Sequence, residues 1–117
     1  MARKLTSPIT TQRGEQLTGR RDAPFVMCFS RQLQNNYEFS CLTAQNIREF
    51  HRFFTRTIGV SVSQVDKGHL KDPDTSDRVD GHGIQHYEVT RSFRIHGYYE
   101  NEFFHVVRLD PRHQVHR

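Results

Sequence analysis

The sequence predicts a single α+β domain in which one or two helices pack on one face of an antiparallel sheet. Its 117 residues are the length of one domain. Apolar residues recur at spacings of three and four between residues 44 and 58, which is typical of a helix with one buried face. Stretches before and after this helix alternate between apolar and polar residues, as strands of a half-buried sheet do.

The beginning of the chain differs from the rest. The first 24 residues show no hydrophobic period, and Thr, Arg, Gln and Gly are frequent among them. Basic residues outnumber acidic ones in this stretch. We therefore expect a flexible basic arm over residues 1–24 and one folded domain over residues 25–117.

Two apolar runs follow the arm. Residues 25–31 place Phe25, Met27 and Phe29 on one face of a strand, and residues 37–42 alternate in the same way. The polar residues Gln34-Asn35-Asn36 between these runs favour a turn. Together they predict an N-terminal antiparallel hairpin.

The helix over residues 44–58 has signals at both ends. Thr43 is suited to cap its first turn, and Gly59 is suited to end it. The polar face carries a ridge of basic residues, Arg48, Arg52 and Arg56. Ser61 and Gln64 form a capping-box pattern that predicts a second, short helix ending near residues 67–68.

The sequence pattern in the final part of the domain predicts a β-meander. Three runs predict its strands, at residues 85–89, 90–99 and 102–109, with a turn at Glu100-Asn101. Pro111 ends the third strand because proline cannot donate to the ladder. Residues 113–116 are expected to pair as a short last strand.

The composition argues against a membrane protein and against a secreted one. No apolar stretch approaches the length of a membrane-spanning helix, and the first residues lack the apolar region of a secretory signal, so we expect a cytoplasmic protein without a membrane partner. Cys28 and Cys41 are then reduced, buried thiols. The net charge of +4 suits a nucleic-acid partner, although it also serves solubility.

Histidine is the unusual residue: the chain has eight, and five of them follow residue 85. Arg94 and His96 lie two apart, on one face of a predicted strand, and His105 could join them from the next strand. A cation steadies charge on a phosphate while an imidazole moves a proton, so this pattern suits phosphodiester cleavage. The alternative is that these polar residues simply face water.

A second candidate group follows the third strand of the meander. Asp110 and His113 lie across a tight turn, where a carboxylate could orient an imidazole. The alternative is an aspartate that caps the turn beside a surface histidine. Residues 68–83 are a polar loop with His69 at its start, and this histidine could close over a substrate or be an ordinary loop residue.

Arginines and tyrosines interleaved on a sheet face can hold phosphates and stack bases. The candidates for contact with RNA are Arg91, Tyr98, Arg108, Arg112, Arg48 and Arg52. The alternative for the tyrosine is core packing. The sequence has no HExxH-type motif, Walker loop or GxGxxG motif, so we expect no metal and no cofactor.

The stretch Phe93 to Tyr98 and the stretch Phe103 to Leu109-Asp110-Pro111-Arg112-His113 resemble the LDxxH-type ends of small, mostly uncharacterised bacterial proteins. The resemblance covers about 40 residues and implies a bacterial or mobile-element protein. It nominates Arg94, Asp110 and His113 as functional positions.

The order of predicted elements is also similar to RelE/ParE-type toxins, in which helices precede an antiparallel sheet with basic and histidine side chains on its last strands. These toxins cleave messenger RNA without a metal, and the resemblance implies a cognate antitoxin as a protein partner. The chain departs from them in its predicted N-terminal hairpin, its acidic loop and its lack of a basic C-terminal helix.

The sequence thus predicts a small, metal-independent endoribonuclease of toxin type. His113 or His96 would take the 2′-hydroxyl proton, Arg94 would steady the phosphate, and Asp110 would orient His113. His69 would protonate the leaving oxygen. The alternative is a non-catalytic module that binds nucleic acid or protein, as a regulator or an inhibitor.

Overall fold

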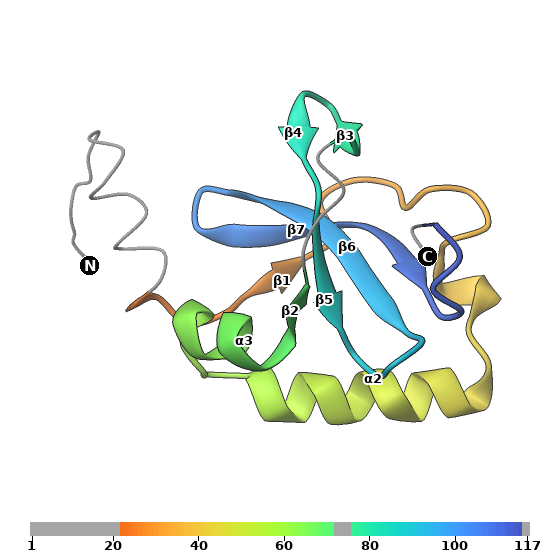
Figure 1. The fold of residues 1–117 in the computed structure, drawn as a ribbon, viewed down its shortest axis with the longest axis horizontal. Coiled ribbons are helices and arrows are strands. Elements are labelled where there is room, and N and C mark those ends of the chain that lie inside the picture. Colours follow the sequence, from red (N-terminus) through yellow and green to blue (C-terminus); the bar gives the residue numbers. More distant parts are fainter. Residues whose placement is uncertain (1–21, 72–75, 116–117) are drawn as a thin grey trace.

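A computed structural model describes residues 22–71 and 76–115 of the chain. Two helices, α2 (Ala44–Thr57) and α3 (Val62–His69), accompany a sheet of five strands and a separate pair of strands (Figure 1). A 3-10 helix, η1 (Phe39–Cys41), precedes α2. The strands are β1 (Met27–Cys28), β2 (Leu70–Lys71), β3 (Arg78–Val79), β4 (His82–Gly83), β5 (Gln85–Glu88), β6 (Arg94–Glu100) and β7 (Phe103–Asp110).

The five-stranded sheet has the order β1-β7-β6-β5-β2. Its consecutive strands β5, β6 and β7 pair antiparallel, which confirms the predicted α+β class and the C-terminal meander. The turn between β6 and β7 lies at Asn101 and Glu102, one residue later than expected. Both have positive φ, 56° and 70°, as two-residue hairpin turns require.

The predicted N-terminal hairpin is wrong. Only Met27 and Cys28 form a strand, and they pair parallel to β7, opposite Phe104 and His105. Residues 37–42 contain η1 instead of a strand, and Phe39 is half exposed. Alternation alone does not identify the partner of a strand, and the partner here is the beginning of β7 instead of the next run in sequence.

Helix α2 begins as predicted and ends one residue earlier than predicted, at Thr57. The Thr43 hydroxyl accepts from the backbone N–H of Asn46, and the Asn46 side chain accepts from the Thr43 N–H. Ile58 is the C-cap, and Gly59 follows with φ +75°. The expected second helix is α3, capped by the Ser61 side chain as predicted.

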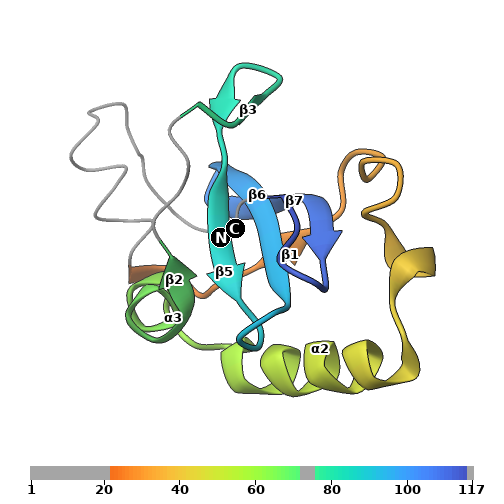
Figure 2. The same ribbon diagram turned by 45° about the vertical axis from the view of Figure 1, so that its right-hand side comes forward.

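The polar loop predicted over residues 68–83 contains regular structure. Strand β2 lies at its start, and β3 and β4 form a small hairpin that projects from the sheet (Figure 2). The turn of this hairpin is Asp80-Gly81, both with positive φ. These strands are two residues long, too short for a recognisable pattern of alternation.

The sheet separates two packed regions. The helix side holds the larger core, made by Phe25, Phe53, Val62, Val65, Tyr87, Val89, Phe93, Ile95, Phe104, Val106 and Leu109. The other side, here called the hairpin side, holds a small cluster of Ile84, Tyr98 and Val107 against Val79 of β3. Most buried polar side chains also lie on this hairpin side.

A bulge sets the positions of the polar side chains. His96 pairs with Arg108 and Gly97 pairs with Val106, so β7 has one extra residue at this point. A Cβ on Gly97 would lie 2.2 Å from the His105 carbonyl oxygen, which explains the glycine. The strands therefore approach closely beside the bulge.

The two ends of the chain are described only in part. Residues 1–21 of the predicted arm lie outside the described residues, whereas Ala23 accepts a hydrogen bond from Val62 and Pro24 bridges to Ser61. The short strand predicted at 113–116 is absent from its described part, residues 113–115, because a turn follows β7. None of the described helices has the length and apolar character needed to span a membrane.

Candidate functional site

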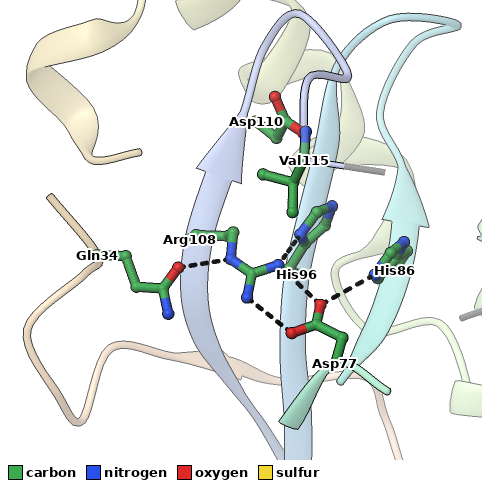
Figure 3. Close-up of polar contacts among 7 residues, drawn as sticks. All are labelled: Gln34, Asp77, His86, His96, Arg108, Asp110 and Val115. Atoms are coloured by element: carbon green, nitrogen blue, oxygen red, sulfur yellow. Dashed lines mark hydrogen bonds and ion pairs between the residues drawn. The ribbon is translucent and has the colours of Figure 1, made fainter. Parts of the chain in front are cut away.

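The buried polar side chains of the hairpin side gather around Arg108, which is 4% exposed (Figure 3). Its Nη1 and Nη2 donate to the two carboxylate oxygens of Asp77 at 2.9 and 3.0 Å. Its Nε donates to Gln34 Oε1 at 2.7 Å. The guanidinium therefore makes a bidentate ion pair, the arrangement that best satisfies a buried arginine.

Two imidazoles complete this group. His96 Nδ1 lies 2.7 Å from Arg108 Nη1. Because arginine can only donate, His96 Nδ1 accepts, and its proton in the neutral form is on Nε2. The His86 ring stacks on the His96 ring with centroids 3.9 Å apart. These five residues, Gln34, Asp77, His86, His96 and Arg108, are called the Arg108 cluster below.

The cluster includes a set with metal-ligand chemistry. Potential ligand atoms of Asp77, His86 and His96 all lie within 4.8 Å of one another. Arg108 Nη1, however, lies within hydrogen-bond distance of both Asp77 and His96. A divalent ion would have to displace this guanidinium, which already balances the carboxylate. The cluster is better described as an arginine-centred network than as a metal site.

Two of the sequence candidates are therefore interior residues. His96, proposed as a base, is fully buried, and Arg108, proposed for RNA contact, is nearly so. The cluster also contains Gln34, Asp77 and His86, which the sequence reasoning did not identify. Asp77 lies in an acidic run that is typical of solvated loops, so nothing in the sequence distinguished it.

The remaining arginine and histidine candidates lie around the start of β6 and the end of β7. Arg94 pairs in register with Asp110 on one side and Glu88 on the other. Its Nη2 donates to the Arg91 carbonyl at 3.2 Å. Its Nε is buried and has no hydrogen-bond partner among the described residues. We call this region the Arg94 end of the sheet.

Asp110 holds the turn that follows β7. Its fully buried carboxylate accepts from the backbone N–H groups of Gln114 and Val115, both at 2.9 Å. The aspartate thus holds the backbone around His113, as expected for the alternative of a turn cap. His113 is half-buried and adopts a positive φ of 52°.

His69 lies at the end of α3, beside the same end of the sheet. Its Nδ1 donates to the Glu88 carbonyl at 3.0 Å, so Nε2 is the nitrogen that can exchange a proton. Its ring packs edge-on against Phe53, with centroids 5.0 Å apart. Nearby, the Lys71 ammonium hydrogen-bonds to Glu88 and lowers the pKa of that carboxyl.

Tyr98 lies inside a stack of rings at the opposite end of the hairpin side. It is 7% exposed and lies between His82, with centroids 4.0 Å apart, and His105, with centroids 5.4 Å apart. His105 Nδ1 is 2.5 Å from the Ser30 hydroxyl oxygen. The tyrosine therefore packs against its neighbours instead of offering a face for base stacking.

The other arginines proposed for RNA contact are at the surface. Arg91 and Arg112 are exposed beside the Arg94 end. Arg48 and Arg52 are exposed on α2, which reaches the same region because its Phe50 contacts Phe93 with ring centroids 6.0 Å apart. These four side chains are available to solvent and to a polyanion.

Comparisons of the chain with known protein families, with curated proteins and with solved structures find no match.

Proposed function

We propose that the protein is a small, metal-independent endoribonuclease of toxin type, with its site at the Arg94 end of the sheet. The observation that carries this proposal is the buried Nε–H of Arg94, which lacks an acceptor among the described residues. An unsatisfied buried donor is costly, and a phosphate oxygen is a suitable acceptor. Half-buried His113 lies three residues after Asp110, the last residue of the neighbouring strand β7.

In the proposed mechanism, His113 takes the proton of a 2′-hydroxyl, and the 2′-oxygen attacks the adjacent phosphorus. The bond from phosphorus to the 5′-oxygen breaks, and His69 supplies the proton to that leaving oxygen. The products are a 2′,3′-cyclic phosphate and a 5′-hydroxyl. Arg94 steadies the charge that develops on the phosphate.

Asp110 has a modified role in this mechanism. Its carboxylate binds the backbone of the turn that carries His113, so it positions the base through the chain. His96 is not retained as a base, because it is fully buried within the Arg108 cluster. Exposed Arg91, Arg112, Arg48 and Arg52 would bind flanking phosphates of the RNA, as expected for a cytoplasmic RNA-binding protein.

The resemblance to RelE/ParE-type toxins adds support. The helices α2 and α3 precede the antiparallel strands β5, β6 and β7, and the last two strands carry arginine and histidine. One of the departures from these toxins, the predicted N-terminal hairpin, is not formed. Fold likeness is an argument by analogy, so the proposal depends on the site.

The test is cleavage of end-labelled RNA in EDTA by the full chain and by His113→Ala and Arg94→Ala. We expect each substitution to lower the rate at least 100-fold, in the range of lost acid–base or electrostatic catalysis. His51→Ala is the matched control, since His51 is exposed on α2. Equal rates for all variants would exclude this assignment of the site.

A protein-binding role is the second candidate, and one observation favours it. Phe29 and Phe39 are both about half exposed, 46% and 51%, and their rings are 5.4 Å apart. They border a hollow of about 410 Å³ that also includes Arg31 and Leu33. Such an apolar patch suits a partner such as an antitoxin. Folded protein that binds RNA without cleaving it would favour the non-catalytic alternative.

A further inference from the structure

The cationic and anionic groups of the Arg108 cluster come from different parts of the fold. The sheet supplies a guanidinium from β7 and two imidazoles, from β5 and β6, all buried. The carboxylate that pairs with this guanidinium is Asp77, which comes from the segment just before β3. The sheet therefore presents one fixed positive charge beside two imidazoles, and a separate segment supplies the negative charge that balances it.

Asp77 holds Arg108 in the way that an oxyanion ligand would. Both of its oxygens accept from the terminal nitrogens of the guanidinium, at 2.9 and 3.0 Å. This fork-to-fork geometry is common to carboxylates and phosphates bound by arginine. We infer that Arg108, His96 and His86 form a binding site for a phosphate group, and that the Asp77 carboxylate occupies the position of the anion in this structure.

The distance between His86 and the Asp77 carboxylate suits an anion larger than a carboxylate. His86 Nε2 lies 3.7 Å from Asp77 Oδ2, too far for a normal hydrogen bond. A phosphate is larger than a carboxylate and has oxygens in four directions. Bound to the same guanidinium, it would bring an oxygen closer to His86 while keeping its bonds to Arg108.

The site can be reached from the side of Asp77. The Asp77 side chain is 9% exposed, more than the side chains of Arg108 and His86 at 5% and 3%. Its segment is bound to the connection between β4 and β5, because the Asp77 carbonyl accepts from the Ile84 N–H. Removal of the Asp77 side chain thus opens the cluster to solvent without removing a strand of the five-stranded sheet.

The site lies next to the proposed nuclease centre. Arg94 and His96 are two residues apart on one face of β6, roughly 7 Å along the strand. The Arg108 cluster would therefore bind a phosphate of the same RNA strand, beside the phosphate held by Arg94. This assignment of the ligand to RNA rests on the proposed function, whereas the anion site itself does not.

The test uses inorganic phosphate as the probe and the full chain as the protein. Binding is measured by calorimetry at constant ionic strength for wild type, Asp77→Ala and Asp80→Ala. Asp80 is the matched control because it is another aspartate of the same hairpin, paired with Arg31 instead of Arg108. We expect Asp77→Ala to bind phosphate at least tenfold more tightly than wild type or Asp80→Ala.

A double variant, Asp77→Ala with Arg108→Met, should lose the added affinity because it lacks the guanidinium. If Asp77→Ala is unfolded in chloride, refolding on addition of phosphate supports the site, since a ligand of the native state stabilises it. Asp77→Asn, which keeps the shape of the side chain, is measured in parallel.

Two results would overturn the inference. One is folded Asp77→Ala that binds phosphate no more tightly than Asp80→Ala, and the other is failure of phosphate to refold both Asp77 variants. These results are distinguishable from failure of the nuclease proposal. Phosphate binding without RNA cleavage overturns only the nuclease, and His113-dependent cleavage without a gain in phosphate binding overturns only this anion site.

Discussion

At the scale of single residues, Arg108 is the centre of the hairpin side. Four of its hydrogen-bond contacts are to side chains, and three other elements or segments supply them. Arg108→Ala would leave the Asp77 carboxylate without its cation in a nearly dry site. We expect a loss of about 3–5 kcal/mol in the free energy of unfolding.

Urea denaturation measures this loss. Arg91→Ala is the control, because Arg91 is exposed and its removal should change stability by less than about 0.5 kcal/mol. A loss below about 1 kcal/mol for Arg108→Ala would mean that the ion pair with Asp77 is not formed in solution.

A substitution at Gly97 can test the bulge between β6 and β7. A methyl group here would lie 2.2 Å from the His105 carbonyl oxygen and 2.8 Å from Phe104. Because the first of these atoms belongs to the backbone, the strands must separate to accept it. We expect Gly97→Ala to destabilise the protein by roughly 2 kcal/mol or more. Gly68→Ala, where the added Cβ has open space, is the comparison, and equal stability of the two variants would contradict the described bulge.

The hydrogen bond between Lys71 and Glu88 should make the free energy of unfolding depend weakly on pH. The Lys71 hydrogen bond lowers the Glu88 pKa below its ordinary value of 4.5. A carboxyl with a lowered folded-state pKa stabilises the fold above its unfolded pKa, and this contribution disappears as the pH falls through the folded value. Wild type should exceed Glu88→Gln in stability above pH 4.5, and the two should converge in more acid solution.

The size of this difference is limited by solvent. The side chains of Lys71 and Glu88 are 47% and 25% exposed, so we expect less than about 1 kcal/mol, decreasing with salt. Urea denaturation of both proteins from neutral to acid pH measures it. A constant difference at every pH would show that Glu88 acts by packing and not by charge.

At the scale of elements, the turn after β7 links stability to the proposed chemistry. The Asp110 carboxylate accepts two backbone hydrogen bonds there, from Gln114 and Val115. Asp110→Ala should cost about 2 kcal/mol, because bonds to a charged acceptor are stronger than neutral ones. Asp110→Asn, which retains one acceptor oxygen, should lose less.

The same pair of variants separates positioning from folding. If Asp110 holds His113 in place, Asp110→Ala should lower the rate constant of RNA cleavage and leave the Michaelis constant for RNA nearly unchanged, with partial recovery in Asp110→Asn. Cleavage and denaturation are measured on both variants. Undiminished turnover by folded Asp110→Ala would separate the turn from the active site.

The elements also show which parts of the fold can be predicted from sequence. Helix α2 and its Thr43 cap were found because their signals lie within one turn of the chain. Strand β1 was misassigned because its partner is Phe104, 77 residues away, and alternation carries no information about the partner. The meander was predicted because its strands are neighbours in sequence and in space.

The candidate site was predicted less completely for the same reason. Arg94 and the pair Asp110 and His113 were identified as two separate groups, each from residues close in sequence, and only the resemblance to LDxxH-type ends joined them. Asp77 and Gln34 reach Arg108 from segments 31 and 74 residues away in sequence. Their contacts depend on the tertiary fold, and neither residue carries a local signal of burial.

At the scale of the whole molecule, the two faces of the sheet carry different kinds of side chain. The helix side contains the larger apolar core, whereas the hairpin side contains the Arg108 cluster and continues into the Arg94 end. Exposed arginines of α2 and of the loops flank that end. In the proposed function, RNA would lie against these exposed arginines and be cut at the Arg94 end.

The most direct test of this account compares an RNA oligonucleotide with its fully 2′-O-methylated copy, both incubated with the protein in EDTA. The account predicts that only the RNA is cleaved and that its fragments end in a 2′,3′-cyclic phosphate, because the 2′-hydroxyl is the nucleophile. Intact RNA with folded protein, or cleavage of both strands, would contradict it.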